Sequence, residues 1–164
     1  MYRNPLDQLV SYYHFKYADR VNPQRDIKSP GNIIDVHLQR YINNFKKMRK
    51  LKKKGTLKLV SYEDLLEFGP EYLQRICRFL EITIDKEKLN LAALRSTPEM
   101  AKRHEKKVGY LHTVDRQQAK SKYIKGARFV RDGSIGQWKK HFSHQEVDRV
   151  MKTLEIAGLP LHHF

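Results

Sequence analysis

Apolar side chains recur at spacings of three and four residues along the first twenty positions of the chain. The stripe consists of Leu6, Leu9, Val10, Tyr13 and Tyr17. This period is typical of an amphipathic helix with one buried face. Asn4 can cap the helix, Pro5 suits its first position, and Asp7 lies in its first turn, where a negative charge is favourable. The sequence therefore predicts a helix that begins at Pro5.

A second stripe of the same period predicts a longer helix from residue 34 through Lys53. Its apolar positions are Ile34, Leu38, Tyr41, Phe45 and Met48. Asn32 is the expected N-cap, with Asp35 as its reciprocal partner, and Gly55 is the expected stop. The helix ends in residues 46–54, KKMRKLKKK, whose positive charges suit the C-terminal end of a helix and could also hold an acidic partner.

The rest of the chain predicts one strand and several shorter helices. Residues 56–61, TLKLVS, alternate in polarity and predict a strand. Since one strand cannot form a sheet, either its partners lie outside this chain or the domain is nearly all helical. Four further helical patterns follow, which begin after Pro70, at Asp85, at Ser96 as a possible cap, and at the capping box of Ser143. Cys77 lies on the apolar face of the first of these, and we expect it to be a core residue. Residues 102–128 are polar without a usable period, and we expect a mobile basic loop there.

Composition indicates one domain with polyanionic partners. The 164 residues are 40% hydrophobic, which is enough for a single modest core. Lys and Arg number 33 against 18 Asp and Glu, and the net charge of +15 favours nucleic acid, sulfated sugars, acidic membrane surfaces or phosphorylated cofactors. One cysteine excludes an internal disulfide framework, and the eight histidines predict no metal site. No segment predicts a membrane span or a signal peptide, so we expect a cytoplasmic location.

Candidate chemistry gathers in residues 129–143, FVRDGSIGQWKKHFS. Gly133 and Gly136 allow the backbone to fold closely around a ligand, and Arg131 adds a fork of donors beside backbone N–H groups. These residues favour an anion, and most of all a phosphate. A glycine pair at this spacing is also common in ordinary loops, so this segment alone leaves both interpretations open.

Three motifs resemble those of one enzyme family. Residues 3–5 and 11–15, RNP and SYYHF, are similar to a segment of the sulfotransferases that use 3'-phosphoadenosine 5'-phosphosulfate (PAPS). Residues 60–65, VSYEDL, resemble the strand-to-helix motif of that family. Residues 129–139 and 141–143 resemble its glycine-rich signature. The motifs occur in the order of the family and bracket nearly the whole chain.

This resemblance implies a cofactor site. In the family, the residues matched by Arg3 and Ser11 bind the 3'-phosphate of the cofactor, and the tyrosine matched by Tyr62 contacts the nucleotide. The glycine loop matched by Arg131 to Gly133 closes on the same phosphate.

Three positions depart from the family pattern. Ser96 falls where the family has a serine near the adenine, but Thr97 stands where an aromatic residue is usual. Asp132 replaces a lysine and Gln137 an aspartate. Because a carboxylate repels a phosphate, we expect Asp132 to offer the cofactor only its backbone N–H group.

The resemblance also implies a fold and a reaction. The fold is α/β, a three-layer arrangement like that of P-loop NTPases, and residues 1–164 form the helix-rich C-terminal part of its single domain. The reaction transfers a sulfuryl group from PAPS to a hydroxyl or amine of a small-molecule or glycan acceptor and leaves 3',5'-ADP. The loop that holds the 5'-phosphosulfate and the catalytic histidine of the family have no match here, so no catalytic residue is identified. An N-terminal half or a second subunit would supply them.

Four histidines are conceivable substitutes for the missing base: His14, His104, His112 and His141. We expect them to be structural or to face solvent, since none follows a strand as the base of the family does. A second hypothesis is a non-catalytic basic module that binds nucleic acid or sulfated glycan through residues 46–54 and 102–128. It predicts affinity that falls steeply with salt. The three motifs favour the nucleotide cofactor over nucleic acid.

Overall fold

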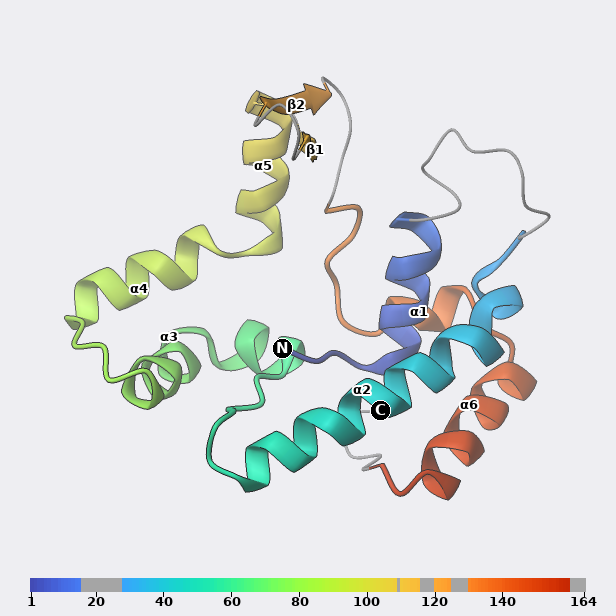
Figure 1. The fold of residues 1–164 in the computed structure, drawn as a ribbon. Coiled ribbons are helices and arrows are strands. Elements are labelled where there is room, and N and C mark those ends of the chain that lie inside the picture. Colours follow the sequence, from blue (N-terminus) through green and yellow to red (C-terminus); the bar gives the residue numbers. More distant parts are fainter. Residues whose placement is uncertain (16–27, 109, 116–119, 125–129, 160–164) are drawn as a thin grey trace. The chain divides into compact units, whose positions relative to one another are not determined.

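The computed structural model describes residues 1–15, 28–108, 110–115, 120–124 and 130–159 (Figure 1). The chain divides into two compact units. Met1–Glu67 and Ile135–Phe164 form the first unit, and Phe68–Ser134 form the second. The two ends of the sequence therefore fold together, with the second unit inserted between them in the chain.

The first unit is helical. Its elements are α1 (Pro5–Tyr13), the 3-10 helix η2 (Pro30–Ile33), α2 (Ile34–Lys53), the first turns of α3 (Tyr62–Phe79), the 3-10 helix η3 (Gln137–Lys140) and α6 (His144–Ile156). The capping box predicted for α6 is present, because the Ser143 hydroxyl accepts from the Glu146 N–H and the Glu146 carboxylate accepts from the Ser143 N–H.

The predicted start of α1 is confirmed. Asn4 Oδ1 accepts from the backbone N–H groups of Leu6 at 2.9 Å and Asp7 at 3.3 Å, and Pro5 is the first helical residue. The cap satisfies two of the N–H donors that a helix start leaves without an intrahelical acceptor. Tyr17, the last residue of the predicted stripe, lies outside the described residues.

The predicted span of α2 is confirmed, but its predicted cap is wrong. The helix ends at Lys53 and Gly55 takes the left-handed conformation with φ of 74°, as expected for a glycine stop. Asn32 belongs to η2, and its Oδ1 accepts from the N–H groups of Ser29 at 3.0 Å and Lys28 at 3.2 Å. Because these donors precede Asn32, the side chain stabilises the turn before the helix and does not cap α2.

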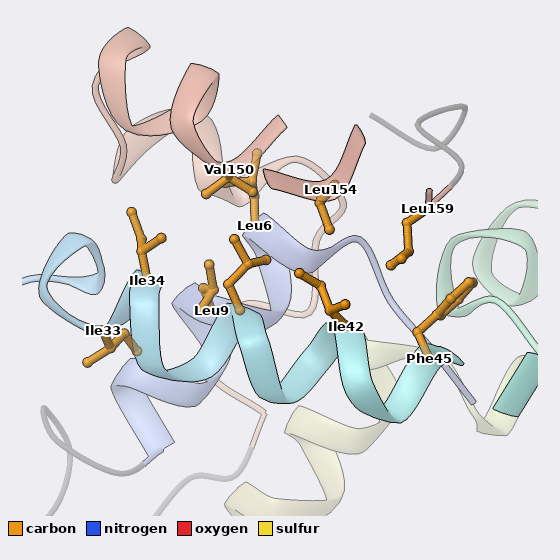
Figure 2. Packing of buried hydrophobic residues seen from close by; sticks show 10 residues of the cluster. Leu6, Leu9, Ile33, Ile34, Ile42, Phe45, Val150, Leu154 and Leu159 are labelled. Atoms are coloured by element: carbon orange, nitrogen blue, oxygen red, sulfur yellow. The ribbon is translucent and has the colours of Figure 1, made fainter. Parts of the chain in front are cut away.

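The core of the first unit lies where α1, α2 and α6 meet (Figure 2). Of its ten buried side chains among the described residues, the two predicted stripes supply five and α6 supplies two. Its buried members include Leu6, Leu9, Ile34, Leu38, Ile42, Phe45, Val150 and Leu154. Each such side chain contributes about 1.5–3 kcal/mol through removal from water. The helical periodicity thus identifies the faces that make this core.

The strand predicted for residues 56–61 is reduced to one contact. Ser61 forms an isolated parallel bridge with Tyr2, and residues 57–60 have no regular secondary structure. The Tyr2 N–H donates to the Val60 carbonyl at 2.8 Å, and the Tyr62 N–H donates to the Tyr2 carbonyl at 2.9 Å. A strand needs a neighbour along its length, and the described N-terminal segment pairs only through Tyr2.

The second unit contains the rest of α3, then α4 (Lys86–Arg95) and α5 (Pro98–Val108). α3 is kinked at Gly69, which has φ of 34° and precedes Pro70. Cys77, predicted to be a core residue, is only partly buried. Thr97 and not Ser96 bonds to the start of α5, since Thr97 Oγ1 accepts from the Met100 N–H at 3.3 Å.

Regular elements occupy much of the segment in which we expect a loop. α5 continues to Val108, and the strands β1 (Tyr110–Asp115) and β2 (Lys120–Ile124) form an antiparallel pair that begins with Tyr110 opposite Ile124. The strands contain β-branched and aromatic residues, which favour extended backbone despite the surrounding charges. Residues 109, 116–119 and 125–128 lie outside the described part, and mobility of the segment stays a prediction.

Leu154 and Ile156 provide a matched test of the α6 packing, because they lie on the same helix with exposed fractions of 1% and 79%. We expect Leu154→Ala to lower the free energy of unfolding by about 2–5 kcal/mol, since it removes buried contacts and leaves a cavity. Ile156→Ala is expected to change it by less than about 0.5 kcal/mol. Urea unfolding followed by circular dichroism measures both, and equal losses would contradict the α6 orientation described above.

Candidate functional site

Arg3 and Tyr62, two of the predicted cofactor residues, lie in contact. The Arg3 guanidinium carbon is 4.4 Å from the centre of the Tyr62 ring, and Arg3 Nη2 is 3.9 Å from Asp7 Oδ2. The Arg3 side chain is 16% exposed. A guanidinium over an aromatic face is attracted by the electron-rich ring. The ring and the carboxylate therefore hold the cation at the N-terminal end of α1.

Hydrogen bonds fix the backbone around Arg3. The Tyr41 hydroxyl donates to the Arg3 carbonyl at 3.1 Å, and the Asn4 N–H donates to Glu63 Oε1 at 2.9 Å. Burial, with a smaller effect of the Glu63 carboxylate, raises the pKa of Tyr41 well above its usual range, so its hydroxyl remains a donor at physiological pH. Arg3 thus projects from a backbone that both α2 and the start of α3 restrain.

Asp7 joins α1 to the glycine-containing segment, the name used below for residues 129–143. Its fully buried carboxylate accepts from the Gly136 N–H at 2.7 Å and from the Trp138 N–H at 2.9 Å. Sequence reasoning assigned Asp7 only to the first turn of the helix and missed this role. Its spacing of four from Arg3 and its place between the apolar residues Leu6 and Leu9 were the available signals.

These bonds change the interpretation of part of the predicted anion loop. The N–H groups of Gly136 and Trp138 bind a carboxylate of the chain itself. Gly136 has φ of 76°, a left-handed conformation that costs glycine little. The donor-rich backbone expected from the glycine pair is therefore present at Gly136, but in this structure it serves an internal anion.

Ser11 lies exposed on α1, one helical turn beyond Asp7. A spacing of four places Asp7 and Ser11 on the same side of the helix. His14 is the C-cap of α1, and its ring lies 5.6 Å from the ring of His141, which follows η3. Both histidines are partly buried, and their structural or solvent-facing role stays a prediction.

The remaining predicted residues belong to the second unit. Ser96 is exposed and its hydroxyl donates to the Ala92 carbonyl at 2.7 Å. Arg131 is exposed, and Gly133 has a left-handed φ of 76°. The Ser134 hydroxyl donates to the Asp132 carboxylate and is the main cause that holds the pKa of Asp132 below its ordinary value, with smaller effects of the Ser134 N–H and of Arg131. The Asp132 carboxylate is thus engaged within its own turn.

Two other features, a metal-ligand group and a membrane-spanning helix, were sought among the described residues. None of their His, Cys, Asp and Glu side chains forms a group of three that could hold a metal ion. None of the described helices is long and apolar enough to cross a membrane.

Asp7 and Gln8 test the link between α1 and the glycine segment, because Asp7 is buried and Gln8, its neighbour, is exposed. Asp7→Ala leaves the N–H groups of Gly136 and Trp138 without their acceptor, and we expect a loss of about 2–4 kcal/mol in the free energy of unfolding. Gln8→Ala should be nearly neutral. Urea unfolding measures both variants, and a small effect of Asp7→Ala would show that water replaces the carboxylate.

The titration of Asp7 gives a second prediction. Burial raises the pKa of the Asp7 carboxyl above its ordinary value of 3.8, although the Gly136 and Trp138 N–H groups and the Arg3 cation lower it. The folded chain then binds more protons than the unfolded chain, so the stability contributed by this titration is fully present below pH 3.8 and is lost as the pH rises through the folded-state pKa.

Asp7→Asn removes this titration. The free energy of unfolding of the wild type minus that of Asp7→Asn should therefore decrease as the pH rises from the acid side toward neutrality. Urea unfolding of both proteins at a series of pH values measures the difference. A difference that grows with pH would mean that hydrogen bonding outweighs burial.

Curated proteins are similar to nearly the whole chain. Sulfotransferase 6B1 of Danio rerio is 29% identical over 168 residues, which cover 98% of this chain and 52% of that protein. Sulfotransferase 2A1 of Homo sapiens is 28% identical over 171 residues, which cover 99% of this chain and 57% of that protein. The chain thus spans about half the length of the curated relatives it matches.

Solved structures share the fold. A retinol dehydratase crystallised with androsterone and the inactive cofactor PAP matches with a TM-score of 0.73 and 21% identity, over 95% of this chain and 45% of that one. A mouse sulfotransferase, SULT7A1, complexed with PAP matches with a TM-score of 0.70 and 16% identity, over 94% of this chain and 55% of that one. These likenesses show that the helix-rich chain has the fold of this part of a sulfotransferase.

The match extends across both units of the structure. The family model described as the sulfotransferase domain covers residues 1–157. This range contains Arg3 with its neighbours Asp7 and Tyr62 (the Arg3 cluster), and it also contains Ser11 and the whole glycine-containing segment. The motifs that suggested the family therefore lie inside the matched region, and the chain belongs to the sulfotransferase domain family.

Proposed function

We propose that the chain is the 3'-phosphate-binding part of a PAPS-dependent sulfotransferase. The observation that carries this proposal is the Arg3 cluster, in which a cation rests on Tyr62 at the N-terminal end of α1, within a family match over residues 1–157. The N-terminal end of a helix attracts anions, and a guanidinium is well suited to a phosphate.

The other proposed cofactor residues can each donate to a phosphate oxygen or contact the nucleotide. Ser11 presents an exposed hydroxyl, and Arg131 presents an exposed guanidinium. Gly133 and Asp132 offer backbone N–H groups in a turn whose glycine is left-handed, and the Asp132 carboxylate already bonds to Ser134. We further propose that Ser96 lies near the adenine. Its bond to the Ala92 carbonyl leaves the hydroxyl oxygen able to accept.

The ligands of solved relatives support the ligands proposed for this chain. Retinol dehydratase was crystallised with PAP and with androsterone or retinol, and SULT7A1 with PAP. By analogy we propose PAPS as the donor, 3',5'-ADP as the product and a small molecule with a hydroxyl or amine as the acceptor. A glycan acceptor is compatible with the same chemistry.

The rest of the proposed enzyme lies outside the described residues. In the transfer, the acceptor oxygen or nitrogen forms a bond to sulfur while the bond from sulfur to the bridging phosphate oxygen breaks, and a base takes the acceptor proton. We propose that an N-terminal half or a second subunit supplies that base, the 5'-phosphosulfate loop and the other strands of a three-layer α/β sheet like that of P-loop NTPases. The chain described here would hold the 3' end of the cofactor.

Nucleotide titration tests the proposal directly. We expect the chain to bind 3',5'-ADP more tightly than 5'-AMP, because only the former carries a 3'-phosphate. Arg131→Ala should weaken 3',5'-ADP binding about 10- to 150-fold, as expected for a lost charge-assisted hydrogen bond. Arg78→Ala is the matched control, since Arg78 is also an exposed arginine of the second unit. Isothermal titration calorimetry measures all four affinities.

Two outcomes would contradict the proposal. Equal affinity of the wild type for 3',5'-ADP and 5'-AMP would show that the chain does not recognise the 3'-phosphate. Binding that ignores the nucleotide but falls steeply with salt, tested with heparin and duplex DNA, would favour the alternative of a basic module that uses the exposed lysines at the end of α2.

A further inference from the structure

We infer that Asp7 is a positioning residue for phosphate recognition: it orients the Arg3 guanidinium while its own carboxylate is locked by the backbone of Gly136 and Trp138. The inference rests on the proposed function, because it assigns Arg3 to the 3'-phosphate of the cofactor. It adds a residue that does not touch the ligand and acts through Arg3.

The geometry separates the two tasks of the carboxylate. Its hydrogen bonds go to backbone, with Oδ2 2.7 Å from the Gly136 nitrogen and Oδ1 2.9 Å from the Trp138 nitrogen. Its contact with Arg3 Nη2 is 3.9 Å, which is longer than a hydrogen bond and within the range of an ion pair. Asp7 therefore acts on Arg3 Nη2 as a fixed negative charge and takes no hydrogen bond from that atom.

This arrangement reduces the freedom of Arg3 before any ligand arrives. An arginine side chain has many rotamers, and ordering it on binding weakens affinity. Here the Tyr62 ring lies 4.4 Å from the guanidinium carbon, and the buried Asp7 carboxylate lies one helical turn away on α1. With these two restraints, Arg3 is held in place in advance for an anion.

A negative charge near the site also opposes an incoming phosphate. In Asp7 two backbone N–H groups and the Arg3 cation offset that charge. The inference requires that the positioning of Arg3 outweighs the remaining repulsion. Neutralising Asp7 must then weaken 3'-phosphate recognition, whereas a carboxylate that only repels would, once neutralised, give tighter binding. The sign of the change decides between the two.

The test compares Asp7→Asn with the wild-type chain in calorimetric titrations with 3',5'-ADP and with 5'-AMP. We expect 3',5'-ADP to bind about tenfold more weakly to the variant, the size typical of coupling between neighbouring groups, and 5'-AMP to bind within about twofold of wild type. A loss confined to the nucleotide with a 3'-phosphate is not expected of general destabilisation.

Two controls separate positioning from stability. Ser143→Ala weakens the capping box of α6 in the same unit, far in sequence from Arg3, and should lower the melting temperature without changing 3',5'-ADP affinity. In a double-mutant cycle, Arg3→Ala combined with Asp7→Asn should bind 3',5'-ADP no more weakly than Arg3→Ala alone, because Asp7 acts through Arg3.

The outcomes distinguish this inference from the proposed function. If the wild type prefers 3',5'-ADP but Asp7→Asn binds it equally or more tightly, the positioning role is wrong and the proposed function stands. Additive losses in the cycle also overturn the positioning role. If the wild type shows no preference, the proposed function itself fails. Should Asp7→Asn not fold, Asp7→Glu takes its place, and it must bind 3',5'-ADP more weakly than the wild type because its carboxylate is displaced by one methylene.

Discussion

The contact on which the first unit depends is the carboxylate of Asp7 with the N–H groups of Gly136 and Trp138. Gly136 lies 129 positions after Asp7 in the sequence, and Trp138 lies 131 positions after it. The contact therefore fixes the C-terminal segment against the first helix. A buried carboxylate without such donors would be costly, and buried N–H groups without an acceptor would be costly as well. Each side of the contact therefore requires the other, and their loss would affect both α1 and η3.

In our proposal the same contact also supports recognition of the 3'-phosphate, because Asp7 lies beside Arg3. Four structural features converge on this residue and its neighbours: the cap at Asn4, the bridge from Tyr2 to Ser61, the ring of Tyr62 and the charge of Asp7. In our proposal none of these features binds the 3'-phosphate, and Tyr62 contacts the nucleotide. Several interactions thus place one cation, as expected where an anion must be recognised precisely.

The glycine-containing segment illustrates the limit of motif reasoning. Glycines and exposed donors indicated an anion, and the structure shows that Gly136 and Trp138 bind the anionic side chain of Asp7. A sequence pattern identifies donor-rich backbone, but it does not identify which acceptor reaches the donors, because that depends on a residue more than a hundred positions away.

The sequence alone determined the helices α1, α2 and α6, the caps at Asn4 and Ser143, the apolar faces that make the core and, through three motifs, the sulfotransferase family. These features depend on local periodicity and on side chains within a turn of one another. Tertiary structure decided what depends on distant partners. Residues 56–61 formed a single bridge because only Tyr2 pairs with them in the described part. The Asn32 side chain accepted from Lys28 and Ser29, which precede η2, and Asp7 became the link to Gly136 because folding buried it beside two backbone donors.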